Sequence, residues 1–165
     1  LTVPVTGPPW RVRLSGGVRR LGGETKGTMS YDIELTDPVT GDTLELDAPH
    51  HMRGGTYAVG GTTRARLNVT YNYYPQFSRV FDVLTEPRPK APEWLRKDGA
   101  PVSGVRTIYG LTGAESLPVL DKAIAQLADD VDADYWKATD GNAKRALVQL
   151  RALAAMRPDG LWAGD

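Results

Sequence analysis

Apolar and polar residues alternate along two stretches of the chain, which is the pattern of strands that bury one face. In the first stretch Tyr31, Ile33 and Leu35 alternate with acidic and hydroxyl side chains. The segment TDPVTGD follows with the proline and glycine of a tight turn, and TLEL then resumes the alternation. The pattern predicts a β-hairpin over residues 30–46.

The second stretch, TRARLNVTYNYY, alternates over a longer run. It predicts a strand near 64–74, preceded by a short strand near 56–59 that turns at Gly60-Gly61. Pro75 would end the longer strand or restrict it to a sheet edge. The face opposite the apolar one carries a row of polar side chains: Arg66, Asn68, Thr70 and Asn72.

The last third of the chain has apolar residues three and four positions apart, which is typical of amphipathic helices. Thr112 and Glu115 match a capping box at the start of the first helix. The spacing predicts helices over 113–129 and 141–157. Strands followed by helices favour an α+β fold, in which we expect both helices to pack on one face of a small antiparallel sheet.

Residues 1–28 are rich in glycine, proline and arginine, with five basic residues against one acidic residue. We expect this segment to be a disordered basic tail. The fold would then begin near Met29, so that residues 29–165 form a single domain. A second segment, residues 84–104, is rich in proline and basic side chains and predicts a long surface loop within that domain.

The composition narrows the possible chemistry. A formal net charge of zero disfavours a non-specific nucleic-acid binder. The absence of cysteine excludes disulfides, thiolate metal sites and a cysteine nucleophile. No apolar run approaches the roughly 20 residues that span a bilayer, so we expect no membrane association and a cytoplasmic location.

The segment HHMRGGTYAVGG holds both histidines of the chain. Adjacent residues of an extended chain point to opposite sides, so His50 and His51 would not share a metal ion. We therefore expect neither a metal nor a cofactor. Arg53, Gly54 and Gly55 could form an anion seat, because glycines let consecutive amides point into one concavity beside the guanidinium. The same glycines could instead form only a turn.

The polar row contains two asparagines, although asparagine has a low β propensity. The amides of Asn68 and Asn72 could orient a ligand, or they could bond a neighbouring loop. If the row and the glycine segment line one surface, that surface would suit a small anionic ligand, and an enzyme there would use His51 as its acid–base group. The candidate ligand-binding residues are Arg53, Gly54, Gly55, Arg66, Asn68, Thr70 and Asn72.

From Met29 onward, the stretches MSYDIELTDPVTGDTLELDAPHH, TIYGLTGAESLPVL and DYWKATDGNAKRAL resemble a group of small uncharacterised proteins of phages and prophages. The resemblance covers residues 29–83 and 105–165. The resemblance implies a phage-encoded accessory protein in the host cytoplasm. It does not identify any residue of this chain as catalytic.

Two functions are open at this point. The regular polar strand face and the lack of a recognisable catalytic set favour a non-catalytic binding or interaction module, with a protein or a small anionic ligand as its partner. The alternative is an enzyme or small-ligand binder that acts on an anionic metabolite or nucleotide. Nucleic-acid binding through Arg64, Arg66 and Tyr74 is less favoured, because burial is the expected fate of the neighbouring tyrosine rings. The sequence predicts no oligomeric state.

Overall fold

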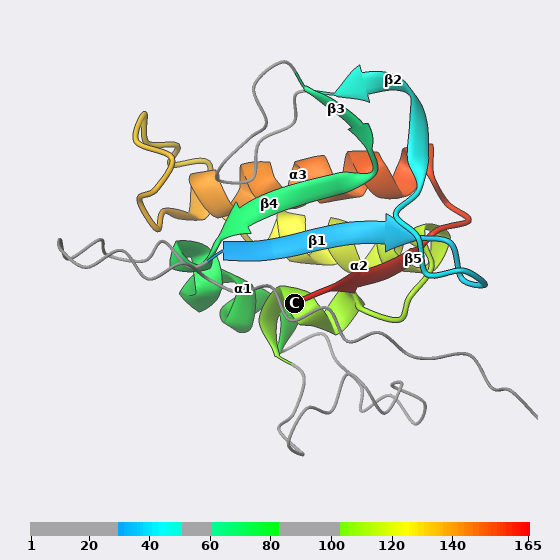
Figure 1. Cartoon of the computed structure of the whole chain (residues 1–165). Coiled ribbons are helices and arrows are strands. Elements are labelled where there is room, and N and C mark those ends of the chain that lie inside the picture. The colour runs from blue at the N-terminus through cyan, green and yellow to red at the C-terminus, as the bar shows by residue number, and fades with distance from the viewer. Residues whose placement is uncertain (1–29, 51–60, 83–102) are drawn as a thin grey trace, which may run out of the picture.

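The computed structural model describes residues 30–50, 61–82 and 103–165. The fold is α+β, with small antiparallel sheets and helices (Figure 1). The predictions for residues 1–28 and 56–59 lie outside the described residues, and so does nearly all of the predicted loop over 84–104.

The larger sheet has three antiparallel strands. Strand β1 (Ser30–Thr36) lies in the centre, between β4 (Arg66–Thr70) and β5 (Leu161–Gly164). Strands β2 (Glu45–His50) and β3 (Thr62–Arg64) form a separate two-stranded ribbon. In Figure 1 the ribbon rises from the end of the larger sheet.

Both predicted C-terminal helices are present and lie behind the larger sheet in Figure 1. Helix α2 (Gly113–Ala125) ends one turn before the predicted limit, and α3 (Asp140–Met156) matches its prediction within a residue at each end. The predicted capping box is confirmed. The Thr112 hydroxyl accepts a hydrogen bond from the Glu115 amide at 3.1 Å, and the Glu115 carboxylate accepts one from the Thr112 amide at 2.9 Å.

The predicted hairpin over 30–46 is only partly present. Strand β1 and the turn after it form as expected, with Gly41 at a positive φ of 76°. The returning chain bonds β1 only briefly, through the Leu44 amide to the Leu35 carbonyl at 2.8 Å, and then continues as β2 to pair with β3. The returning chain cannot pair further with β1, because β4 and β5 already pair with the two edges of that strand.

The predicted strand over 64–74 is wrong at its second half. Strand β4 ends at Thr70, whose hydroxyl accepts a hydrogen bond from the Asn72 amide at 3.1 Å and so caps a short 3-10 helix, Tyr71–Tyr73. Helix α1 (Tyr74–Phe81) follows, with Pro75 in its first turn. A proline is well tolerated there because the first amides of a helix have no partner within it. The alternation of tyrosines therefore resembled a strand without forming one.

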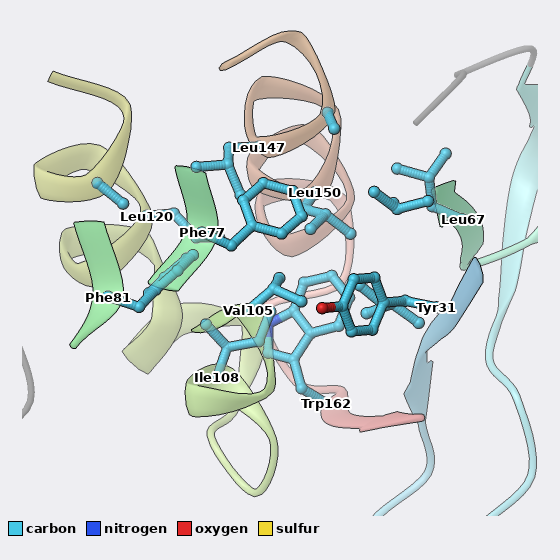
Figure 2. Packing of buried hydrophobic residues seen from close by; sticks show 14 of the residues in the cluster. Tyr31, Leu67, Phe77, Phe81, Val105, Ile108, Leu120, Leu147, Leu150 and Trp162 are labelled. Atoms are coloured by element: carbon cyan, nitrogen blue, oxygen red, sulfur yellow. The ribbon is translucent and has the colours of Figure 1, made fainter. Parts of the chain in front are cut away.

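The helices and the larger sheet enclose one core. Figure 2 shows Tyr31 of β1 and Leu67 of β4 facing Leu147 and Leu150 of α3, with Trp162 of β5 below them. All of these side chains are at most 2% exposed. Helix α1 adds two phenylalanines, and a second 3-10 helix, Gly104–Ile108, closes the lower side.

Candidate functional site

The outer face of the larger sheet carries the first half of the predicted polar row. The side-chain amide of Asn68 donates hydrogen bonds to the Ser30 hydroxyl at 2.8 Å and to a carboxylate oxygen of Asp32 at 2.9 Å. The Arg66 guanidinium pairs with the same Asp32 oxygen at 3.0 Å. Burial raises the pKa of Asp32, but the hydrogen bonds from Asn68 and Arg66 outweigh it, and the net pKa is below the usual value. These groups hold β1 to β4.

The row ends with Thr70, the last residue of β4, because Asn72 lies in the 3-10 helix that follows. Thr70 is buried, and the Asn72 side-chain amide donates to the carbonyl of Trp136 at 2.8 Å. Asn72 therefore bonds a neighbouring loop, which is one of the two roles that the sequence allowed. Of the four predicted residues, only Arg66 and Asn68 lie on β4 with side chains that are not buried, and ligand binding by any of the four stays a prediction.

The predicted anion seat of Arg53, Gly54 and Gly55 lies outside the described residues, as does His51. Its relation to the polar row therefore stays a prediction. Within residues 30–50, 61–82 and 103–165, no three histidine, aspartate or glutamate side chains are grouped so that they could hold a metal ion.

The acidic loop between α2 and α3 uses its carboxylates to hold its own backbone. Asp130 accepts a hydrogen bond from the Gly141 amide at 3.0 Å, and Asp132 accepts one from the Asp134 amide at 2.9 Å. Lys137 lies 2.9 Å from Asp132, and its ammonium lowers the pKa of that carboxyl. The loop is a hydrogen-bonded connection between the helices.

An arginine–tyrosine cluster fixes the C-terminal end of the described chain. The Arg106 guanidinium lies over the rings of Tyr31 and Tyr71, at 5.1 and 5.5 Å from their centroids, and its Nε donates to the Asp165 carbonyl at 2.8 Å. Burial raises the pKa of Tyr31 to about 12 and raises that of Tyr109 further. Both phenols therefore stay protonated at neutral pH.

The outer side of helix α3 carries apolar side chains that no described element covers. Leu147 and Leu150 point from α3 into the core (Figure 2), so the opposite side of the helix faces outward. On that side, residues three and four positions apart form what we call the α3 stripe: Arg145, Val148, Ala152 and Ala155. Met156 flanks the stripe, and Val148 and Met156 are 46% and 47% exposed.

A hollow of about 390 Å³ lies beside the N-terminal end of the α3 stripe. Val131 and Val148 supply its apolar part, and Asp129, Lys144 and Arg145 supply its charged part. Lys144 pairs with Asp129 at 2.7 Å, whereas Arg145 is exposed and forms no ion pair with any described residue. The hollow therefore combines an apolar floor with one uncompensated positive charge.

This surface was not predicted from the sequence, although a signal for it was present. The core side of α3 and the α3 stripe both repeat at helical spacing, so the helix is apolar on two sides. A helix that packs against the core of its own chain with one side needs only one apolar face. The second face does not stand out in the sequence, because apart from Arg145 its members are two alanines and a single valine, which are common at solvent-facing positions.

Comparisons with known proteins give no relative: no protein-family model, no curated protein and no solved structure matches this chain. The resemblance to phage and prophage proteins stays a prediction. Across the described part of the chain, no helix has the length and apolar character needed to cross a membrane.

Proposed function

We propose that the chain is a non-catalytic protein-interaction module that binds through the α3 stripe and the adjoining hollow. One observation carries the proposal. The outward side of α3 has two exposed apolar side chains, Val148 and Met156, together with Arg145, which forms no ion pair with any described residue. The centres of protein interfaces are apolar, and arginine is enriched in them.

The shape of the hollow favours a protein partner over a small molecule. Val131 and Val148 line it and are each about half exposed, so the hollow is open to solvent. A small-molecule pocket typically removes roughly 70–90% of its ligand's surface from water, which an open hollow does not do. An aliphatic side chain of a partner could cover both valines while a neighbouring carboxylate meets Arg145.

The shifted pKa values among the described residues support a non-catalytic role. The pKa values of Asp121 and Asp140 are lowered by the guanidinium groups of Arg151 and Arg79, and the pKa values of the buried tyrosines are raised. Each shift moves the group away from neutral pH. A general acid or base works best with a pKa near the working pH, so these groups are suited to structure. The proposal includes that the chain is a phage-type accessory protein located in the cytoplasm.

The proposal is tested by site-specific photocrosslinking in an extract of the source cells. A photoreactive phenylalanine derivative at Val148 should crosslink to a discrete partner, because the α3 stripe lies at the interface. The matched control places the same group at Val39, which is 91% exposed on the turn after β1 and far from α3 in sequence. The control should give no such product.

Arg145→Glu in the Val148-labelled chain should reduce the crosslink, since it reverses the charge beside the hollow. Equal crosslinking from Val148 and Val39 would contradict the proposal. The alternative, an anionic small ligand, is tested by titrating nucleotides and inorganic phosphate while the amide resonances near Arg145 are followed by NMR. Saturable shifts there, without a crosslinked partner, would favour a ligand binder over an interaction module.

A further inference from the structure

The acidic loop between α2 and α3, residues 128–138, contributes no side chain to the core. Every side chain in this range is exposed or only partly buried. The core resumes on both sides of the loop, with Leu127 at 4% and Ala143 at 0% exposure. Burial of apolar surface therefore fixes the two helices but not the loop between them, and polar contacts must hold the loop in place.

One set of hydrogen bonds holds the loop to the segment around the start of α1. The Asn72 side-chain amide donates to the Trp136 carbonyl at 2.8 Å, and the Gln76 side-chain amide donates to the Ala138 carbonyl at 2.6 Å. The Tyr73 hydroxyl donates to the carbonyl directly before that of Trp136. All three acceptors are main-chain carbonyls of a loop at the surface, so water can replace the donors when the loop lifts away.

Asn142 of α3 holds the loop from the other side, at three points. Its side-chain oxygen accepts a hydrogen bond from the Asp132 amide at 3.1 Å, and its side-chain nitrogen donates to the carbonyls of Asp134 and Lys137 at 3.0 and 3.1 Å. Inside the loop, the Lys137 amide donates to the Asp134 carbonyl at 3.0 Å, and the Lys137 ammonium lies 2.9 Å from the Asp132 carboxylate. These inner contacts keep the shape of the loop, so we expect its outer contacts to form and break together.

The same loop forms one wall of the hollow beside the α3 stripe. Asp129 and Val131 belong to the loop, whereas Lys144, Arg145 and Val148 belong to α3. An ion pair of 2.7 Å between Lys144 and Asp129 joins the two walls, but the Asp129 side chain is 87% exposed, and exposed ion pairs contribute little stability. The hollow therefore keeps its shape only while the loop lies against α3.

We infer that the acidic loop opens and closes as a unit while the core stays folded, and that its opening takes the hollow apart. Segments that bury little apolar surface open at a lower free energy than the core does. A partner that binds the hollow holds the loop closed, because it binds only the closed state. This last consequence rests on the proposed function, whereas the opening itself does not.

The opening is tested on the full chain by amide hydrogen exchange, followed by NMR at two kinds of reporter. The Asp132 amide, which is bonded to Asn142, reports on the loop. The slowest amides of α3 report on global unfolding. After correction for intrinsic exchange rates, the Asp132 amide should exchange at least about tenfold faster than the slowest α3 amides.

Two variants separate opening of the loop from unfolding of the whole chain. Asn72→Ala removes a hydrogen bond that exists only in the closed state, so the Asp132 amide should exchange roughly 2- to 12-fold faster. Ile33→Val removes one carbon from the core, where Ile33 is completely buried. It should speed exchange at the slowest α3 amides roughly 2- to 12-fold and leave the Asp132 amide unchanged, because the core is intact in the open state.

Either of two results would overturn the inference. If Ile33→Val speeds exchange equally at both kinds of reporter, the loop opens only when the whole chain unfolds. If Asn72→Ala leaves the Asp132 amide unchanged, a contact four residues away does not affect that amide, and the loop does not open as a unit.

The link to binding is tested on the crosslinked product from the Val148-labelled chain, by exchange measured with mass spectrometry on peptides that cover residues 128–138. These peptides should exchange at least about tenfold more slowly in the product than in the free chain. Equal exchange would overturn the link. If no crosslinked product forms although the two variants behave as expected, the proposed function falls and the opening of the loop stands.

Discussion

The indole nitrogen of Trp162 donates a hydrogen bond to the hydroxyl oxygen of Ser116 at 2.8 Å, and both side chains are completely buried. The Ser116 hydroxyl in turn donates to the carbonyl of Gly113 at 2.7 Å. The Ser116 hydroxyl therefore accepts a hydrogen bond from a side chain of β5 and donates one to a carbonyl in the first turn of α2. The contact joins β5 to α2 at the bottom of the core.

Ser116→Ala should destabilise the protein by about 1–3 kcal/mol, because it leaves the buried indole N–H without an acceptor. Urea unfolding followed by tryptophan fluorescence measures the change. Ser103→Ala is the matched control, since the Ser103 side chain makes no capping hydrogen bond, and it should cost less than about 0.5 kcal/mol. A Ser116→Ala protein as stable as the control would show that the hydroxyl is not the indole's acceptor.

Gly141 marks a close approach between α3 and the acidic loop. A Cβ at this position would lie 2.5 Å from the amide nitrogen of Val131 and 2.6 Å from the carbonyl carbon of Asp130. Gly141→Ala should therefore destabilise the protein, although alanine is the better helix former by about 1 kcal/mol. The loop must move, so the amide resonances of Val131 and Arg145 at the hollow should shift as well.

The control for Gly141 is Gly41→Ala in the turn after β1. No atom lies within 4 Å of the added Cβ there, and only the positive φ of 76° opposes the substitution, at a cost of roughly 1–2 kcal/mol. Gly41→Ala should leave the resonances at the hollow unchanged. Gain of stability in Gly141→Ala would contradict the close approach.

The helices of the last third could be predicted because their signals are local. The capping hydroxyl of Thr112 and the carboxylate of Glu115 are three residues apart, and the apolar stripes repeat within each helix. Strand β5 could not be predicted in this way. It has only four residues, and its partner β1 lies far away in sequence, with Thr36 and Leu161 separated by 125 positions.

The end of β4 shows a second limit. Tyr71 and Tyr73 continue the alternation of the strand, yet Tyr73 is buried in a 3-10 helix and its ring packs edge-on against Phe77 of α1. Burial in the tertiary structure decided the conformation there, over a strand propensity that was locally strong. For the polar row, the sequence identified the unusual asparagines but not their partners, because Asp32 and Trp136 come from distant segments.

Acid should weaken the link between α1 and α3. A carboxylate oxygen of Asp140 lies 2.6 Å from the Arg79 guanidinium and accepts a hydrogen bond from the Ala128 amide at 3.2 Å. The hydrogen bond from Arg79 lowers the pKa of Asp140 below its unfolded value of 3.8. A lowered folded-state pKa gives stability that is present above the unfolded pKa and is lost as the pH falls through the folded pKa.

Asp140→Asn should therefore lower the melting temperature at pH 7 by about 1–4 °C, since a partly exposed ion pair contributes less than about 1 kcal/mol. The difference from the wild type should shrink below about pH 4. Asp42→Asn, at an exposed carboxylate that forms no ion pair within the described residues, should change little at any pH. A difference for Asp140→Asn that stays constant down to pH 2 would exclude an electrostatic origin.

The orientation of α3 is the premise of the proposed function, and two substitutions two residues apart on this helix test it. Leu150 is completely buried, and Leu150→Ala should cost about 2–5 kcal/mol through lost burial and a cavity. Val148→Ala should change the free energy of unfolding of the monomer by less than about 0.5 kcal/mol, because Val148 faces outward and alanine has the higher helix propensity.

Both values are measured by urea unfolding. A large cost for Val148→Ala would mean that Val148 is packed inside its own chain. The α3 stripe would then be part of the core, and no interaction surface could be built on it.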